Sequence, residues 1–164
     1  MIAMFNKKSI LTTAVIIIAV AGSIWATQIR SDTKPGALFS ADNTDVVKNG
    51  LEIYSANCAS CHGADLKGEA NWRSPNADGL MPAPPHNKRG HTWHHTDDLL
   101  FEITKYGLAK ITGQKDYKTN MPIYEGVLSD KEIIAALSYI KSTWPENIRD
   151  RHDQMNELKA KDKK

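Results

Sequence analysis

Apolar residues recur at helical spacing in three parts of the chain, and this pattern predicts an all-α domain. The expected helices cover about 44–57, 96–107 and 129–144. Each of them has a polar capping residue at its start, and the last two end at glycine or proline. These signals are Thr44 or Asp45 for the first helix, Thr96 with Asp97, Asp98 and Gly107 for the second, and the capping box of Ser129 and Glu132 with Pro145 for the third.

Between these helices lie two long segments without periodicity, 63–95 and 108–128. Unstructured loops of this length in a small domain are usually functional. Four prolines and two tryptophans stiffen the first loop and give it apolar surface to bury: Pro75, Pro82, Pro84, Pro85, Trp72 and Trp93. We expect this loop to wrap around a bound group.

The N-terminus contains a short basic stretch and then an uncharged run of 17 residues, Ile10 to Ala26. That length is at the low end for a membrane span. A secretory signal is the alternative, with Ala19-Val20-Ala21 as its cleavage site. Both interpretations export the rest of the chain, because positive charge precedes the apolar run. We favour an uncleaved anchor over residues 1–26, since 22–26 stays apolar.

Residues 27–43 are expected to form a flexible linker. Residues 145–164 are expected to form a solvated polar tail, with a helix at its start left open and a frayed, basic end. The formal net charge of +2 comes from Lys7 and Lys8, and from Thr27 onward there are 19 basic and 19 acidic residues. The exported part is therefore near neutral, and its charge does not indicate a nucleic-acid partner.

The stretch Cys58-Ala59-Ser60-Cys61-His62 is the sequence signature of c-type haem attachment. The two thiols can each add to one vinyl group of the haem, and the histidine can then bind the iron. A redox dithiol is disfavoured, because no alternating strands and helices follow. A zinc site would need further ligands, and there is no third cysteine. Nearby histidines could supply such ligands, namely His86, His91, His94 and His95.

Residues 53–63 contain this motif, and Asn120-Met121-Pro122 and the end of the last helix, 138–141, follow it in order. From Asp45 to Trp144 the chain resembles a bacterial class I cytochrome c. The resemblance implies a small all-α domain, residues 44–144, around one covalently bound haem c. It implies an electron carrier rather than an enzyme. Its partners would be redox proteins on the periplasmic side of the inner membrane, where the N-terminal segment would tether it.

The resemblance also implies how the domain is assembled. In this family the first helix crosses the last one at a glycine and an aromatic residue. Gly50 and Tyr54 match that pattern, and Ala136 and Tyr139 would lie opposite them. The family also uses a carbonyl in a proline-bearing loop to accept a hydrogen bond from the haem histidine. The segment 81–85 is the counterpart here, and the choice between Pro82 and Pro84 stays open.

The second axial ligand is expected to be Met121, because histidine with methionine suits electron transfer. Met121 lies in the loop before the last helix, and Pro122 favours an extended backbone at that point. Met81 also precedes a proline. It lies 19 residues after His62, in the loop that we assign to the proximal side of the haem.

Three histidines in five residues, His91, His94 and His95, could bind copper or zinc, form a docking patch, or be exposed polar residues, and we favour the last. Two other functions stay open. One is a cytochrome c subunit of a larger dehydrogenase or oxidase. The other is a haem sensor or peroxidase with an open distal face. The chain contains no glycine-rich phosphate loop and no Gly-x-Ser-x-Gly motif.

Overall fold

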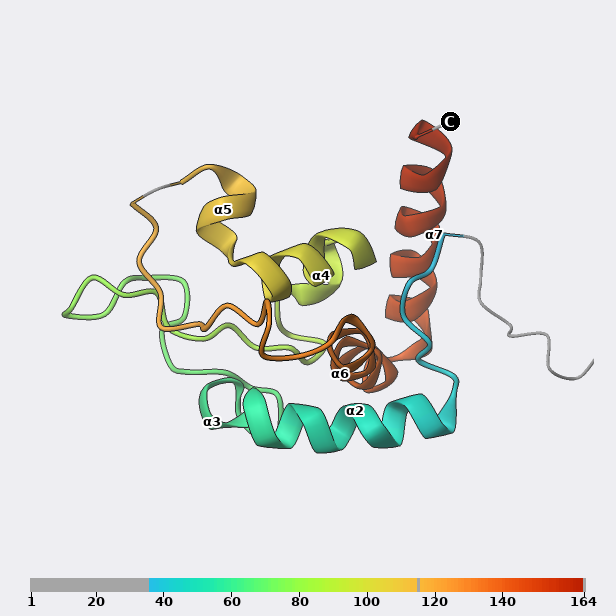
Figure 1. The fold of residues 1–164 in the computed structure, drawn as a ribbon, viewed down its shortest axis with the longest axis horizontal. Coiled ribbons are helices and arrows are strands. Elements are labelled where there is room, and N and C mark those ends of the chain that lie inside the picture. The colour runs from blue at the N-terminus through green and yellow to red at the C-terminus, as the bar shows by residue number, and fades with distance from the viewer. Residues whose placement is uncertain (1–35, 115, 164) are drawn as a thin grey trace, which may run out of the picture. The chain divides into compact units, whose positions relative to one another are not determined.

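The computed structural model describes residues 36–114 and 116–163 (Figure 1). Within these ranges there are helices and no strands, apart from one isolated bridge between Met81 and Thr119, so the all-α prediction is confirmed. The elements are α2 (Thr44–Asn57), α3 (Ala59–His62), the 3-10 helix η1 (Thr92–His94), α4 (Asp97–Tyr106), α5 (Leu108–Thr112), α6 (Asp130–Ser142) and α7 (Glu146–Asp162).

The predicted anchor or signal, and the linker as far as residue 35, lie outside the described residues. Among the helices that are described, none has the length and apolar character needed to cross a membrane. The loop predicted at 63–95 is confirmed except for η1 at its end, whereas the loop predicted at 108–128 contains the short helix α5.

The predicted caps are confirmed for two helices and corrected for one. Thr96 caps α4, and Ser129 with Glu132 forms a complete capping box at the start of α6. Helix α2 is capped by Asn43 instead of Thr44 or Asp45. The Asn43 side chain accepts hydrogen bonds from the backbone N–H groups of the second and third residues that follow it, at 3.1 and 3.2 Å. Asparagine is as good a cap as aspartate, so the local pattern did not distinguish these neighbours.

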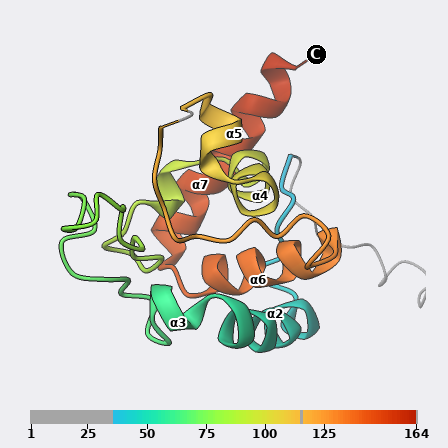
Figure 2. The same cartoon turned by 60° about the vertical axis from the view of Figure 1, so that its left-hand side comes forward.

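Helices α2 and α6 cross each other (Figures 1 and 2). The contacts of Gly50 place it at this crossing, as the family resemblance implied. A Cβ atom at position 50 would overlap the carbonyl oxygen of Ala135 and lie 3.0 Å from the Cβ of Tyr139. The rings of Tyr54 and Tyr139 pack with their centroids 5.3 Å apart. Gly50 therefore contacts Tyr139, as expected. Its second contact is Ala135 instead of the expected neighbour Ala136.

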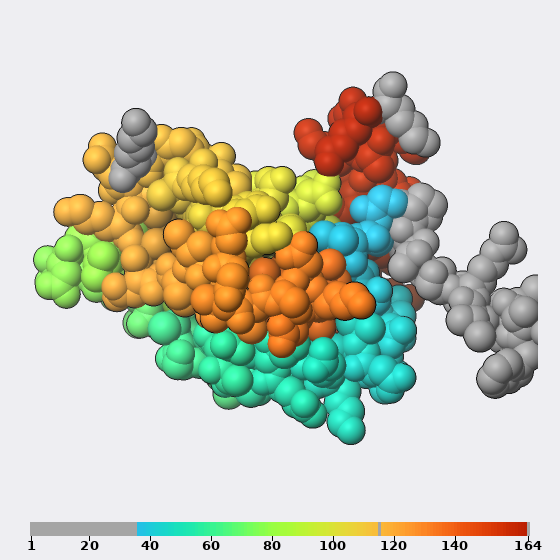
Figure 3. Space-filling model, in the orientation of Figure 1, coloured from blue at the N-terminus to red at the C-terminus, as the bar shows by residue number. Residues whose placement is uncertain are grey.

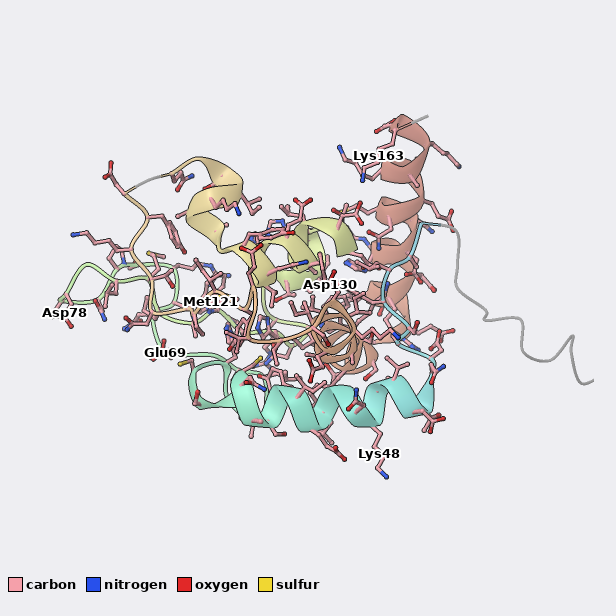
Figure 4. All side chains as sticks on the ribbon, in the orientation of Figure 1. Lys48, Glu69, Asp78, Met121, Asp130 and Lys163 are labelled. Atoms are coloured by element: carbon pink, nitrogen blue, oxygen red, sulfur yellow. The ribbon has the colours of Figure 1, made fainter. Side chains whose placement is uncertain are left out.

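Replacing Gly50 by valine is expected to lower the free energy of unfolding by about 1–3 kcal/mol, because the added atoms overpack the crossing. Chemical denaturation of the haem-loaded protein measures this change. Lys48→Val is the matched control, since Lys48 is exposed on the same helix and carries the same cost of a β-branched residue (Figure 4). Equal stability of the two variants would show that the crossing tolerates bulk.

Helix α6 lies between α2 and α4, and its residues supply much of the core (Figures 2 and 3). The buried apolar residues come from α6, from α2 and α4, and from the loops beside them. They are Phe39, Tyr54, Leu66, Leu100, Tyr124, Ile133, Leu137, Ile140 and Trp144.

The C-terminal segment forms a continuous helix, and the prediction of a solvated tail is wrong. Helix α7 buries three polar residues, His152, Asp153 and Asn156. The Nε2–H of His152 donates to the carbonyl of His95 at 2.8 Å, and Asn156 exchanges two hydrogen bonds with Asp97 at 2.8 and 3.0 Å. Helix α7 is thus held by buried polar contacts to the start of α4.

The end of the predicted flexible linker is also fixed in place. The backbone N–H groups of Leu38 and Phe39 both donate to Oδ2 of Asp97, at 2.8 and 3.0 Å, and the Phe39 ring is buried in the core. The N–H of Ser40 donates to the hydroxyl of Ser138 on α6 at 2.9 Å. The packed domain therefore extends beyond the predicted limits 44–144 at both ends.

Candidate functional site

The two cysteines of the C-x-x-C-H motif lie at the junction of α2 and α3. Cys58 is the residue between the two helices, and Cys61 lies within α3. The backbone N–H of Cys58 donates to the Tyr54 carbonyl at 2.8 Å, and the N–H of His62 donates to the Cys58 carbonyl at 3.0 Å. One helical turn separates the two thiols, which places Cys58 and Cys61 on the same face. Both thiols are free, with Cys58 half-buried and Cys61 exposed. Burial raises the pKa of the Cys58 thiol, which keeps it protonated at neutral pH.

His62 is buried and has a defined tautomer. Its Nδ1 atom lies 2.8 Å from the carbonyl oxygen of Pro84. Because a carbonyl can only accept, Nδ1 carries the proton and Nε2 keeps its lone pair. Burial lowers the pKa of His62, so the ring is neutral at pH 7. The structure thus selects Pro84 over Pro82 as the acceptor, and it presents a nitrogen that is ready to bind a metal.

Gly68 lets the two loop segments beside His62 approach each other. Its backbone N–H donates to the His62 carbonyl at 2.8 Å, and its φ of +65° lies in the left-handed region. A Cβ atom here would lie 2.5 Å from the Ala83 carbonyl oxygen and 2.6 Å from the carbonyl carbon of Pro84. Sequence analysis did not identify Gly68, because a single glycine in a loop has many possible causes.

Two tyrosines tie the ends of the motif to the rest of the domain. The Tyr54 hydroxyl donates to the carbonyl of Gly63, just after His62, at 2.7 Å. The Tyr124 hydroxyl donates to the carbonyl of Asn57, just before Cys58, at 2.6 Å. Burial, followed by the neighbouring Cys58 thiol, raises the pKa of Tyr124 to about 12, so the phenol remains a donor at neutral pH. Sequence analysis missed Tyr124, since its partner is 67 residues away.

Met121 is half-buried on the segment between α5 and α6 (Figure 4). Its backbone N–H donates to the hydroxyl of Thr119 at 3.1 Å. The N–H of Met81 donates to the Lys118 carbonyl at 3.0 Å, and Met81 pairs with Thr119 in the isolated bridge. The two methionine-bearing loops, which sequence analysis treated as separate, are therefore in contact.

The side-chain rings of the histidine cluster, His91, His94 and His95, pack against one another and against Trp93. The centroid of His91 lies 5.4 Å from that of His94 and 4.6 Å from that of His95, and His94 stacks on Trp93 at 3.7 Å. Across residues 36–114 and 116–163, no three histidine, cysteine, aspartate or glutamate side chains are arranged to hold a metal ion. The copper or zinc alternative for this cluster therefore has no support in the described residues.

The residues present fit a covalently bound haem. Two free thiols share one face of a helical turn, and a buried, neutral imidazole with an available Nε2 follows them directly. An all-α domain with this arrangement defines a c-type haem protein as its class.

Comparison with known families agrees with this class. The family model for Cytochrome c matches residues 47–144, which is more than half of the chain. The chain therefore belongs to the cytochrome c family. Neither a curated protein nor a solved structure matches it. Membership of this family means that the cofactor is covalently attached haem c, one per chain, and that the chain works by haem-based electron transfer.

Proposed function

We propose that the chain is a class I, single-haem electron carrier. In this proposal Cys58 and Cys61 would hold the haem through thioethers, and His62 and Met121 would bind its iron as the two axial ligands. The observation that carries the proposal is the hydrogen bond from His62 Nδ1 to the Pro84 carbonyl, because it leaves Nε2 as the only ring nitrogen free to bind iron. When bound, the haem supplies an iron that changes its oxidation state by one electron.

The chain's own residues support this role by limiting movement around the site. Pro84 fixes His62, while Tyr54 and Tyr124 fix the backbone on either side of the motif. Little of this framework needs to move when the iron changes charge. A carrier benefits from such rigidity, since each movement coupled to electron transfer adds to its barrier.

Covalent attachment provides the test of this proposal. The full chain is produced in a host that matures c-type cytochromes, extracted with acid-acetone and stained for haem on a denaturing gel. Haem is expected to stay with the wild-type protein and to be lost from the double variant Cys58→Ser, Cys61→Ser. Ser60→Ala is the control, because Ser60 is exposed in the same turn. Free extraction of haem from the wild type, or zinc in place of iron, would overturn the proposal.

A further inference from the structure

The imidazole ring of His86 stacks on the face of His62. The two ring centroids are 4.0 Å apart, and the ring planes differ by 22°. Burial lowers the pKa of His86 well below its usual value, and His62 lowers it further, so the stack consists of two neutral rings at neutral pH. In the sequence His86 stands out only as one of several possible zinc ligands, and the electron-carrier function gives it no role.

We propose that His86 is a positioning residue that fixes the plane of the His62 imidazole about its bond to iron. This inference rests on the proposed function, in which His62 is an axial ligand. The hydrogen bond to Pro84 restrains one atom of the His62 ring. A flat ring packed against its face restrains the plane of the ring itself. The two contacts together leave the imidazole one orientation.

His86 can act in this way because it is itself held on several sides. Its Nδ1 atom lies 2.7 Å from the Thr92 hydroxyl, and its carbonyl accepts a hydrogen bond from Nε1–H of Trp144 at 2.7 Å. Its backbone N–H donates to the Leu66 carbonyl at 2.9 Å. The Tyr54 ring meets it edge-on, with the centroids 6.4 Å apart. Because both the ring and the backbone of His86 are restrained, the His86 ring can restrain the orientation of the His62 ring that packs against it.

Thr92 explains part of the histidine-rich segment. Its side chain is buried, and its hydroxyl contacts His86 at 2.7 Å and the Pro85 carbonyl at 3.4 Å. The segment that contains His91 and His94 therefore places the Thr92 side chain next to the His86 ring. The chain from Thr92 through His86 to His62 is a second layer of contacts behind the expected ligand, and such layers orient metal-binding histidines and tune the metal.

The orientation of an axial imidazole has a direct spectroscopic signature in the oxidised protein. Together with the orientation of the second ligand, it determines the order and spread of the paramagnetically shifted haem methyl resonances, and it affects the largest g value in electron paramagnetic resonance. A loss of stability alone does not change either quantity. These two spectra are therefore the appropriate readouts for a positioning role.

The test compares four variants with the wild type, all as haem-loaded full chains. His86→Leu removes the flat ring and is expected to change the order of the methyl resonances and to shift the largest g value. His86→Phe keeps a flat ring but lacks the bond to Thr92, so it is expected to retain the order of the resonances and to differ from the wild type no more than Thr92→Val does. Thr92→Val releases His86 from its partner and is expected to give a smaller change. His91→Leu is the control, since His91 is exposed, and no change is expected.

The outcomes separate this inference from the proposed function. A wild type that shows no low-spin ferric haem with histidine ligation would overturn the proposed function. A normal wild-type spectrum that His86→Leu leaves unchanged would overturn the positioning role alone. If His86→Leu does not fold, an unchanged spectrum in Thr92→Val overturns the positioning role instead.

Discussion

Replacing Met121 by alanine is expected to open the iron to external ligands, whereas Met81→Ala leaves it closed. The oxidised Met121→Ala protein should lose the weak near-infrared charge-transfer band of sulfur ligation, and the reduced protein should bind CO. Met81→Ala should keep the band and exclude CO. The reason is the placement of Met121 three residues before Tyr124, whose hydroxyl is anchored 2.6 Å from the Asn57 carbonyl, next to the cysteines that are proposed to bind the haem.

Met81→Ala is a close control for Met121→Ala, because the loop that carries Met81 contacts the loop that carries Met121. The backbone N–H of Met81 donates to the Lys118 carbonyl, and both methionines are half-buried. If Met81→Ala is the variant that loses the band, the two loops face the haem in the reverse of the proposed order. If the wild type already lacks the band, histidine is the distal ligand and the reduction potential is much lower. CO binding by the wild type would favour a sensor or peroxidase instead.

The local sequence signals predicted the helices around the site well. Capping residues and apolar spacing act within a few residues, so the starts of α4 and α6 follow from Thr96 and from Ser129 with Glu132. The Gly50 crossing could also be predicted, because close approach of two helices leaves few residues other than glycine possible. The motif at 58–62 predicts a haem-binding turn by its spacing alone, and the assignment of its residues to the haem stays a prediction.

The contacts that complete the site could not be predicted in the same way. The choice of Pro84, the stacking of His86 on His62 and the bond from Tyr124 to Asn57 join residues 22 to 67 positions apart. No local propensity encodes which carbonyl or ring will be nearest after the chain has folded. Such pairs depend on the path of the loops, which the sequence pattern leaves open.

The packing of α7 against the domain was not predicted for a different reason, since its buried face is polar. The residues that it buries, His152, Asp153 and Asn156, resemble a solvated surface when only apolar spacing is considered. Their partners are Asp97 and Lys141, which are themselves polar and buried. A polar face of this kind becomes recognisable as an interface only when its complementary groups are known.

Replacing Asp97 by alanine is expected to destabilise the protein by about 3–5 kcal/mol, as is typical when one member of a buried charged pair is removed. Asp97 is fully buried, and its carboxylate accepts from the N–H groups of Leu38 and Phe39 and from the Asn156 amide. It also lies 3.6 Å from the ammonium group of Lys141, which pairs with Asp153 at 2.7 Å. Alanine would leave three buried donors without their acceptor and would weaken the compensation of a buried positive charge.

Chemical denaturation measures the loss of stability, and limited proteolysis shows where it acts. Cleavage is expected first within α7 and near residues 36–40, because Asp97 joins both segments to α4. Asp98→Ala is the matched control. Asp98 is the next residue on the same helix, and its ion pair with Lys163 is exposed, so its removal should leave stability and cleavage unchanged. If Asp97→Ala were as stable and as resistant as Asp98→Ala, the buried polar contacts would not be what holds α7 to the domain. Other contacts of α7 would then hold it, such as the half-buried Ile148, which packs against the apolar core, and the ion pair between Arg149 and Asp42.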